Sequence, residues 1–168
     1  MTVICDTGPL IYLVRIGHLS LLKEMFDSIT IPEEVYREVC VKGRGKPGAK
    51  EIEQAGWINT KEVDDKVLVD LLRVELDRGE AEVITLAKQV DAKRVVIDEK
   101  IPRKKLRSMD FQVVGTVGLL VWASQNGLVS DLKGSLDELR DKGMWISDEL
   151  YEKALERESK KNTHNKGK

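Results

Sequence analysis

Acidic side chains directly follow two apolar, strand-like runs of this 168-residue chain. Asp6 comes after the run 2–5, and Asp98 and Glu99 come after the run 94–97. Ligands of an open parallel sheet bind beyond the carboxyl ends of the strands, so neighbouring strands would bring these carboxylates together. Clustered carboxylates repel each other unless they share a cation, and sets of oxygen ligands suit Mg²⁺ or Mn²⁺. The alternative role of each acid is to cap the helix that follows it.

Two predicted helices supply further carboxylates. Glu38 lies in the predicted helix 32–39, and Glu80 lies in the first turn of a helix that begins at residue 79. Glu82 competes with Glu80 for the same role, but two residues correspond to about 200° around a helix, so both cannot face one ion. The simpler alternatives are a solvated helix face for Glu38 and a favourable interaction with the helix dipole for Glu80.

Short apolar runs alternate with helical patterns along the chain. Near-continuous apolar character is typical of strands that are covered on both faces. Five runs have this character: 2–5, 28–31, 57–60, 94–97 and 111–114. Between them, apolar residues recur at helical spacing, and alternation of strands with helices predicts an α/β fold with a mainly parallel sheet. Two more helices are expected between residues 128 and 158.

The composition limits the class of protein. The chain has 28 basic and 29 acidic residues, so a uniformly basic nucleic-acid binder is excluded and a polyanion would need a local patch. An apolar fraction of 41% excludes a wholly disordered chain. No apolar run approaches the roughly 20 residues of a membrane span, and the N-terminus lacks a signal sequence, so we expect a cytoplasmic protein without membrane contact. Few Asn and Gln beside many charged residues favour a thermophilic source.

Five blocks, spread in a fixed order over residues 2–128, together resemble a PIN domain. They are Asp6-Thr7, the segment 32–39, Gly79-Glu80-Ala81-Glu82, the segment 96–99 and the segment 114–120. The resemblance is strongest to a prokaryotic branch that is related to the VapC-type toxin ribonucleases. It implies a three-layer α/β/α sandwich with a mainly parallel sheet. Residues 1–128 would form the nuclease domain, residues 129–159 would be helices packed on it, and residues 160–168 would be a disordered tail.

The resemblance also implies the residues of a nuclease site. Four carboxylates would bind Mg²⁺ or Mn²⁺: Asp6, Glu38, Glu80 and Asp98. Thr7 matches a small hydroxyl residue that supports the first acid. Glu99 stays open as the alternative to Asp98, because members of the family differ at this point. Many PIN domains have Asp where this chain has Glu80, and the longer side chain would change the spacing around the metal.

A basic run follows the last of these acids. Five of the eight residues in 100–107 are positively charged, and the run would lie beside the site. We expect Arg103, Lys104 and Lys105 to contact RNA phosphates, with Arg44 and Lys46 of the glycine-rich loop 42–48 as a second contact. The alternative is an ordinary solvated helix face.

The sequence therefore predicts a Mg²⁺- or Mn²⁺-dependent endoribonuclease that hydrolyses phosphodiester bonds of single-stranded or structured RNA. A PIN fold that binds RNA or a protein partner without cutting is the main alternative, because a fold does not determine function. The resemblance also implies a homodimer, and a toxin role would require an antitoxin protein as partner.

Overall fold

A computed structural model describes residues 1–165 and shows one five-stranded sheet in which all neighbours are parallel. The strands lie in the order β3-β2-β1-β4-β5. Their bounds are β1 (Val3–Cys5), β2 (Ile29–Pro32), β3 (Ile58–Lys61), β4 (Arg94–Val96) and β5 (Gln112–Val114). The predicted α/β class, the parallel sheet and all five predicted strands are confirmed.

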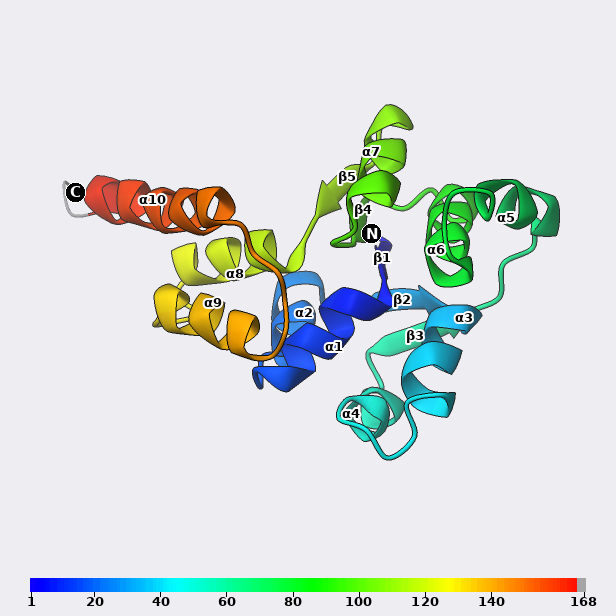
Figure 1. Ribbon diagram of the computed structural model, residues 1–168, viewed down its shortest axis with the longest axis horizontal. Coiled ribbons are helices and arrows are strands. Elements are labelled where there is room, and N and C mark those ends of the chain that lie inside the picture. The colour runs from blue at the N-terminus through cyan, green and yellow to red at the C-terminus, as the bar shows by residue number, and fades with distance from the viewer. Residues whose placement is uncertain (166–168) are drawn as a thin grey trace.

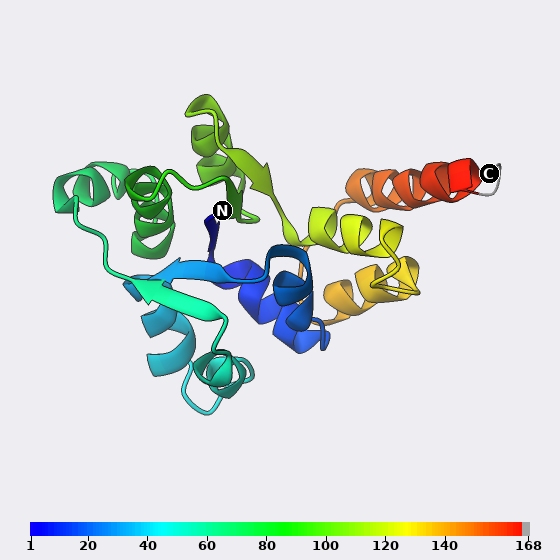
Figure 2. The ribbon, with the colours of Figure 1, turned by 180° about the vertical axis from the view of Figure 1, so that it is seen from behind.

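Helices cover both faces of this sheet, which confirms the three-layer arrangement (Figure 1). α6 packs on β1 and β2, α7 packs on β5, and α1 packs against α8. Their bounds are α1 (Thr7–Arg15), α2 (Ser20–Phe26), α3 (Glu33–Tyr36), the π-helical turn η1 (Arg37–Val41), α4 (Ala49–Gln54), α5 (Lys66–Leu72), α6 (Arg78–Gln89), α7 (Lys100–Ser108), α8 (Thr116–Gln125), α9 (Leu132–Asp141) and α10 (Asp148–Asn165). Figure 2 shows β2 and β3 side by side at one end of the sheet.

The register of the central strands aligns their carboxyl ends. Cys5 of β1 pairs with Val96 of β4, and Val96 pairs with Val114 of β5. The backbone N–H of Asp6 donates to the carbonyl of Val96 at 2.9 Å, which extends this pairing by one residue. The residues that follow β1, β4 and β5 therefore emerge at one edge of the sheet, as the sequence predicts.

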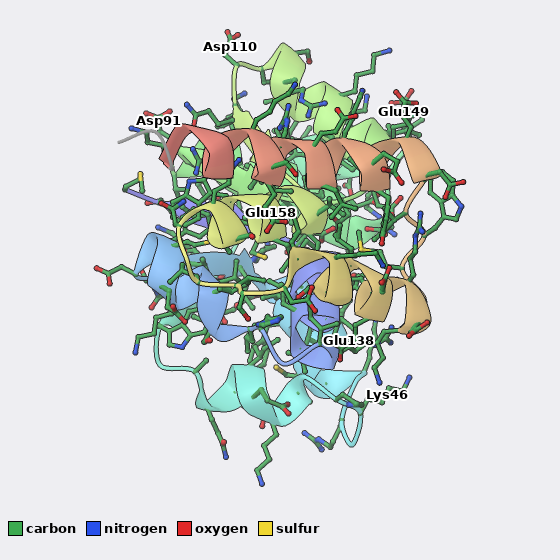
Figure 3. All side chains as sticks on the ribbon, turned by 90° about the vertical axis from the view of Figure 1, so that its left-hand side faces the viewer. Lys46, Asp91, Asp110, Glu138, Glu149 and Glu158 are labelled. Carbon is green, nitrogen blue, oxygen red and sulfur yellow. The ribbon has the colours of Figure 1, made fainter. Side chains whose placement is uncertain are left out.

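The C-terminal helices pack on the same body as the sheet. α10 packs on α8 and α9, and Figure 3 shows it running alongside α8 on the side of the molecule that faces the viewer. Ser147 caps α10, because its hydroxyl accepts the N–H of Leu150 at 3.1 Å. Tyr151 and Ala154 of α10 are buried, and the helix continues to Asn165. The tail predicted from residue 160 therefore begins inside this helix. Residues 166–168 of that predicted tail lie outside the described residues.

No helix within residues 1–165 is long and apolar enough to cross a membrane.

Candidate functional site

Asp6 is a nearly buried carboxyl group at the edge where β1 ends. It occupies the N-cap position of α1, but its side chain makes no capping hydrogen bond, so the capping alternative does not account for it. Only 7% of the residue is exposed. The pKa of Asp6 is raised from its ordinary 3.8 to about 7; burial is the largest cause, the nearby charges of Glu38, Asp77 and Glu80 contribute, and the backbone N–H of Thr7 opposes the shift. A proton or a metal cation would relieve this accumulation of negative charge.

Glu38 is held between the first residues of two helices. It lies in η1, and π-helical turns of this kind often occur at functional sites. The Thr7 hydroxyl donates a hydrogen bond of 2.5 Å to Glu38 Oε2. A β-carbon on Gly79 would lie 2.6 Å from Glu38 Oε1, so the missing side chain lets the carboxylate lie against α6. Burial is the largest cause of a raised pKa for Glu38, and Asp77 and Glu34 add to it. Glu38 is therefore half-buried beside the acidic cluster.

The first turn of α6 contributes two carboxylates. Asp77 and Glu80 form a capping box, in which Asp77 Oδ1 accepts the N–H of Glu80 at 2.8 Å and Glu80 Oε2 accepts the N–H of Asp77 at 3.1 Å. Burial raises the pKa of Glu80, with the charges of Asp77, Glu99 and Glu38 as further causes. Glu80 thus has the predicted helix-end role and also lies beside the cluster. Sequence reasoning missed Asp77, although an Asp three residues before a Glu at the start of an apolar helix is a signal for this motif.

Asp98 enters the site from the end of β4 and is fixed by Thr116. The backbone N–H and the hydroxyl of Thr116 donate to its two oxygens, each at 2.7 Å. A β-carbon on Gly8 would lie 3.7 Å from Asp98 Oδ2, so this carboxylate reaches the turn that carries Asp6. Burial raises the pKa of Asp98, and the bonds from Thr116 and the charge of Arg103 oppose that shift. Sequence reasoning quoted Thr116 as part of a block but missed its contact with Asp98.

Glu99 is placed differently from Asp98. It is exposed at the N-cap of α7, makes no side-chain capping bond, and contributes negative charge to the surroundings of Glu80. The structure therefore brings both candidates toward the cluster, with Asp98 inside it and Glu99 at its border.

Glu82, the rival of Glu80, belongs to a separate ion-pair network. It is buried, its Oε2 lies 3.2 Å from Arg78 Nε, and its Oε1 accepts the N–H of Glu34 at 3.4 Å. Glu34 is also buried and lies 3.4 Å from Lys42 and 3.6 Å from Arg37. This network joins α3 to α6, and its cations already compensate Glu82.

The basic residues of α7 divide into inward and outward groups. Arg103 is half-buried, and its guanidinium donates to the carbonyl of Ile97 at 2.9 Å, so it supports the loop that carries Asp98. Lys105 pairs with Glu75. Lys100 and Lys104 are exposed, one helical turn apart, directly after Glu99. Arg44 lies in the predicted loop and borders a groove of about 480 Å³ beside α4, which Lys46, Lys50, Glu51 and Glu53 also line.

The carboxylate cluster fits a divalent cation in its chemistry. Its donors are carboxylate oxygens, the ligand type that Mg²⁺ and Mn²⁺ prefer, and its buried member Asp6 lies among like charges. Within residues 1–165, no group of three or more Asp, Glu, His or Cys side chains is arranged so that it could hold a metal ion as it stands. Binding of an ion at the cluster would therefore require these side chains to move.

The fold and the site together define a three-layer α/β/α protein with an acidic cluster at the carboxyl edge of its parallel sheet. A family model described as "DUF3368: PIN domain" matches residues 2–160, so this chain belongs to the PIN domain family. The match includes the C-terminal helices as well as the sheet. No curated protein matches the chain at a significant level.

Proposed function

We propose that this PIN domain is a divalent-metal-dependent endoribonuclease whose site is the carboxylate cluster beyond β1 and β4. The observation that supports it most is the state of Asp6, a buried acid whose pKa is raised to about 7 among other acids. Such an arrangement costs stability in the free protein, and strongly shifted acids are concentrated at functional sites. PIN domains are generally nucleases, which gives this cluster its reaction class.

Asp6, Glu38, Glu80 and Asp98 would hold Mg²⁺ or Mn²⁺. When bound, such an ion supplies Lewis acidity toward a phosphate oxygen and acidifies a water molecule near neutral pH. Thr7 fixes Glu38 through the 2.5 Å hydrogen bond, and Thr116 fixes Asp98 through two bonds of 2.7 Å. These contacts limit the rotation of both carboxylates before any substrate binds, which reduces the reorganisation that catalysis requires.

The contacts with the RNA backbone are assigned from the exposed face of α7. Lys100 and Lys104 follow Glu99 and point their charges to solvent beside the cluster. Lys100 joins the predicted phosphate contacts Arg103, Lys104 and Lys105. In the free protein Arg103 donates to the carbonyl of Ile97 and Lys105 pairs with Glu75, so Lys100 and Lys104 are the more readily available of the four. Arg44 and Lys46 remain a proposed second contact, while homodimer formation, a toxin role and an antitoxin partner stay predictions.

Cleavage of a fluorescent 20-nucleotide single-stranded RNA tests this proposal. Wild type should cut the RNA with Mn²⁺ and not with EDTA, and Asp6→Asn should slow cleavage by about 100-fold or more. Asp70→Asn, a matched change at an exposed aspartate of α5, should cut like wild type. A single-stranded DNA of the same sequence tests the preference for RNA.

Two results would contradict the proposal. Equal cutting by wild type and Asp6→Asn would mean that the cluster does not carry the activity. Saturable RNA binding without any Mn²⁺-dependent cutting would identify a PIN domain that binds and does not cleave.

A further inference from the structure

A groove of about 560 Å³ lies along the β5 edge of the sheet. Its walls come from β5, the end of α7, the outer face of α8 and Arg157 of α10, four segments whose arrangement Figure 1 shows. Arg94 and Gln112, which line it, are the first residues of β4 and β5. The carboxylate cluster follows the last residues of the strands, so the groove is a separate surface that the proposed nuclease reaction does not use.

The strand β5, which lines the groove, is an edge strand of the sheet. Among the strands of residues 1–165, β5 pairs with β4 alone and ends the sheet. An edge strand presents backbone N–H and C=O groups that another extended chain can pair with. Addition of a strand to such an edge is a common way to bind a peptide, in which the backbone provides affinity and side-chain pockets provide specificity.

The floor of the groove is apolar. Phe111, Val113 and Trp122 line it, and Trp122 is 41% exposed. Gly118 of α8 also lines the groove, and a β-carbon there would lie 3.0 Å from Val114 Cγ2. The absence of a side chain at Gly118 therefore lets α8 lie close to β5. An exposed aromatic side chain next to an open strand edge is the kind of surface that an apolar side chain of a partner would cover.

The rim of the groove is positively charged. Arg94, Arg107 and Arg157 line it, and its lining contains no aspartate or glutamate. None of the three arginines forms an ion pair with a residue in the described part of the chain, although ion pairs are numerous elsewhere. Arg94 instead donates to Gln112 Oε1 at 2.9 Å and lies 5.9 Å from the centre of the Phe26 ring. In a chain of net charge −1, three arginines without an ion pair around one groove favour the binding of an acidic partner.

We propose that this groove docks an extended, acidic segment of a partner protein, which adds to β5 as a further parallel or antiparallel strand. Alternate side chains of the segment would be apolar and cover Val113 and Trp122, and its carboxylates would meet the three arginines. A protein segment is favoured over RNA because the strand edge offers backbone pairing and the floor is apolar. The proposal is independent of nuclease activity.

Fluorescence anisotropy with defined peptides tests the proposal on the full chain. The probe is a labelled nonapeptide of alternating glutamate and valine, and the comparison peptide has lysine in place of every glutamate. The acidic peptide should bind saturably and at least about tenfold more tightly than the basic one. The double variant Arg107→Glu/Arg157→Glu should weaken acidic-peptide binding by about tenfold or more, and Lys88→Glu, on the exposed face of α6, should leave it unchanged.

Backbone amide exchange measured by NMR distinguishes strand addition from loose electrostatic attraction. Saturating acidic peptide should slow exchange of the Val113 amide and leave the amides of β3, at the other edge, unchanged. The proposal is overturned if both peptides bind equally, if the arginine variants bind the acidic peptide like wild type, or if exchange in β5 does not change. Binding of a 12-nucleotide oligouridine that the same arginine variants abolish, with no binding of the acidic peptide, would identify an RNA surface instead.

Discussion

Neutralising Asp6 should change how the stability of the metal-free protein depends on pH. Asp6 has a pKa of about 7 in the folded chain and its ordinary value of 3.8 when unfolded. A raised folded pKa means that the folded state holds a proton which the unfolded state has lost. This contribution to stability is fully present below pH 3.8 and is lost as the pH rises through 7. The free energy of unfolding therefore falls between mildly acidic and neutral pH.

The size of this effect follows from the pKa gap. About 3 pKa units at 1.36 kcal/mol each amount to about 4 kcal/mol across the whole window. Between pH 5 and pH 8 the window covers about 2 units, or about 3 kcal/mol. Asp6→Asn cannot titrate, so its stability relative to wild type should rise by about 3 kcal/mol from pH 5 to pH 8. The other acids of the cluster are present in both proteins and largely cancel in this difference.

Urea unfolding in EDTA at pH 5, 6, 7 and 8 measures this difference, and Asp70→Asn is the matched control. Repeating the series with Mg²⁺ should stabilise wild type at pH 8 and leave Asp6→Asn unchanged, because an ion that binds only the folded state adds to its stability. If the difference between wild type and Asp6→Asn is the same at all four values, Asp6 is not protonated in the folded protein and the argument from its burial is refuted.

Three further predictions concern the supports of the cluster. Gly79→Ala should slow RNA cleavage at least tenfold, because the added β-carbon displaces Glu38. The free energy of unfolding in urea should stay unchanged or rise by up to about 1 kcal/mol, since alanine favours helix. A cleavage rate equal to that of wild type would contradict the close approach of Glu38 to Gly79. Thr116→Val should lower the cleavage rate about tenfold, because it removes the hydrogen bond from the hydroxyl to Asp98. Thr116→Ser keeps the hydroxyl and should cleave RNA at close to the wild-type rate. If the serine variant is as slow as the valine variant, Thr116 acts through packing and not through this hydrogen bond. Glu82→Gln should cost about 1–3 kcal/mol in urea unfolding, because it removes the charge of a buried carboxylate that pairs with the half-exposed Arg78. Mn²⁺ affinity measured by calorimetry should stay unchanged, and a loss of affinity would show that Glu82 is a ligand.

The sheet and its acidic edge could be predicted because short-range patterns determine them. Continuous apolar runs indicated all five strands, but the prediction only assumed that the strands ending at Cys5 and Val96 are neighbours, which the register of β1 and β4 shows. Helix ends were harder to predict. Pro32 was expected in the first turn of a helix, but it is the last residue of β2 and pairs with Lys61, because pairing with β3 extends the strand to the start of α3.

The supports of the site depend on contacts between distant segments. Thr7 and Glu38 are 31 residues apart, and Asp98 and Thr116 are 18 apart, so no local pattern indicates either hydrogen bond. The inward turn of Arg103 also depends on the fold, because the run 100–107 alone does not show which cations face solvent. Before α10, the large apolar side chain of Trp145 is 84% exposed and its neighbour Ile146 is buried, which the local pattern does not show either.

A crystal structure with Mn²⁺ would test most directly whether the carboxylates at the ends of β1 and β4 act together as a cation site. An anomalous difference map should show a peak within about 2.0–2.6 Å of an oxygen of Asp6 and of at least one of Glu38, Glu80 and Asp98. The proposal of a metal-dependent nuclease would be contradicted if no peak appears at this edge at saturating Mn²⁺. A peak only elsewhere in the protein, with the four carboxylates in unchanged positions, would contradict it as well.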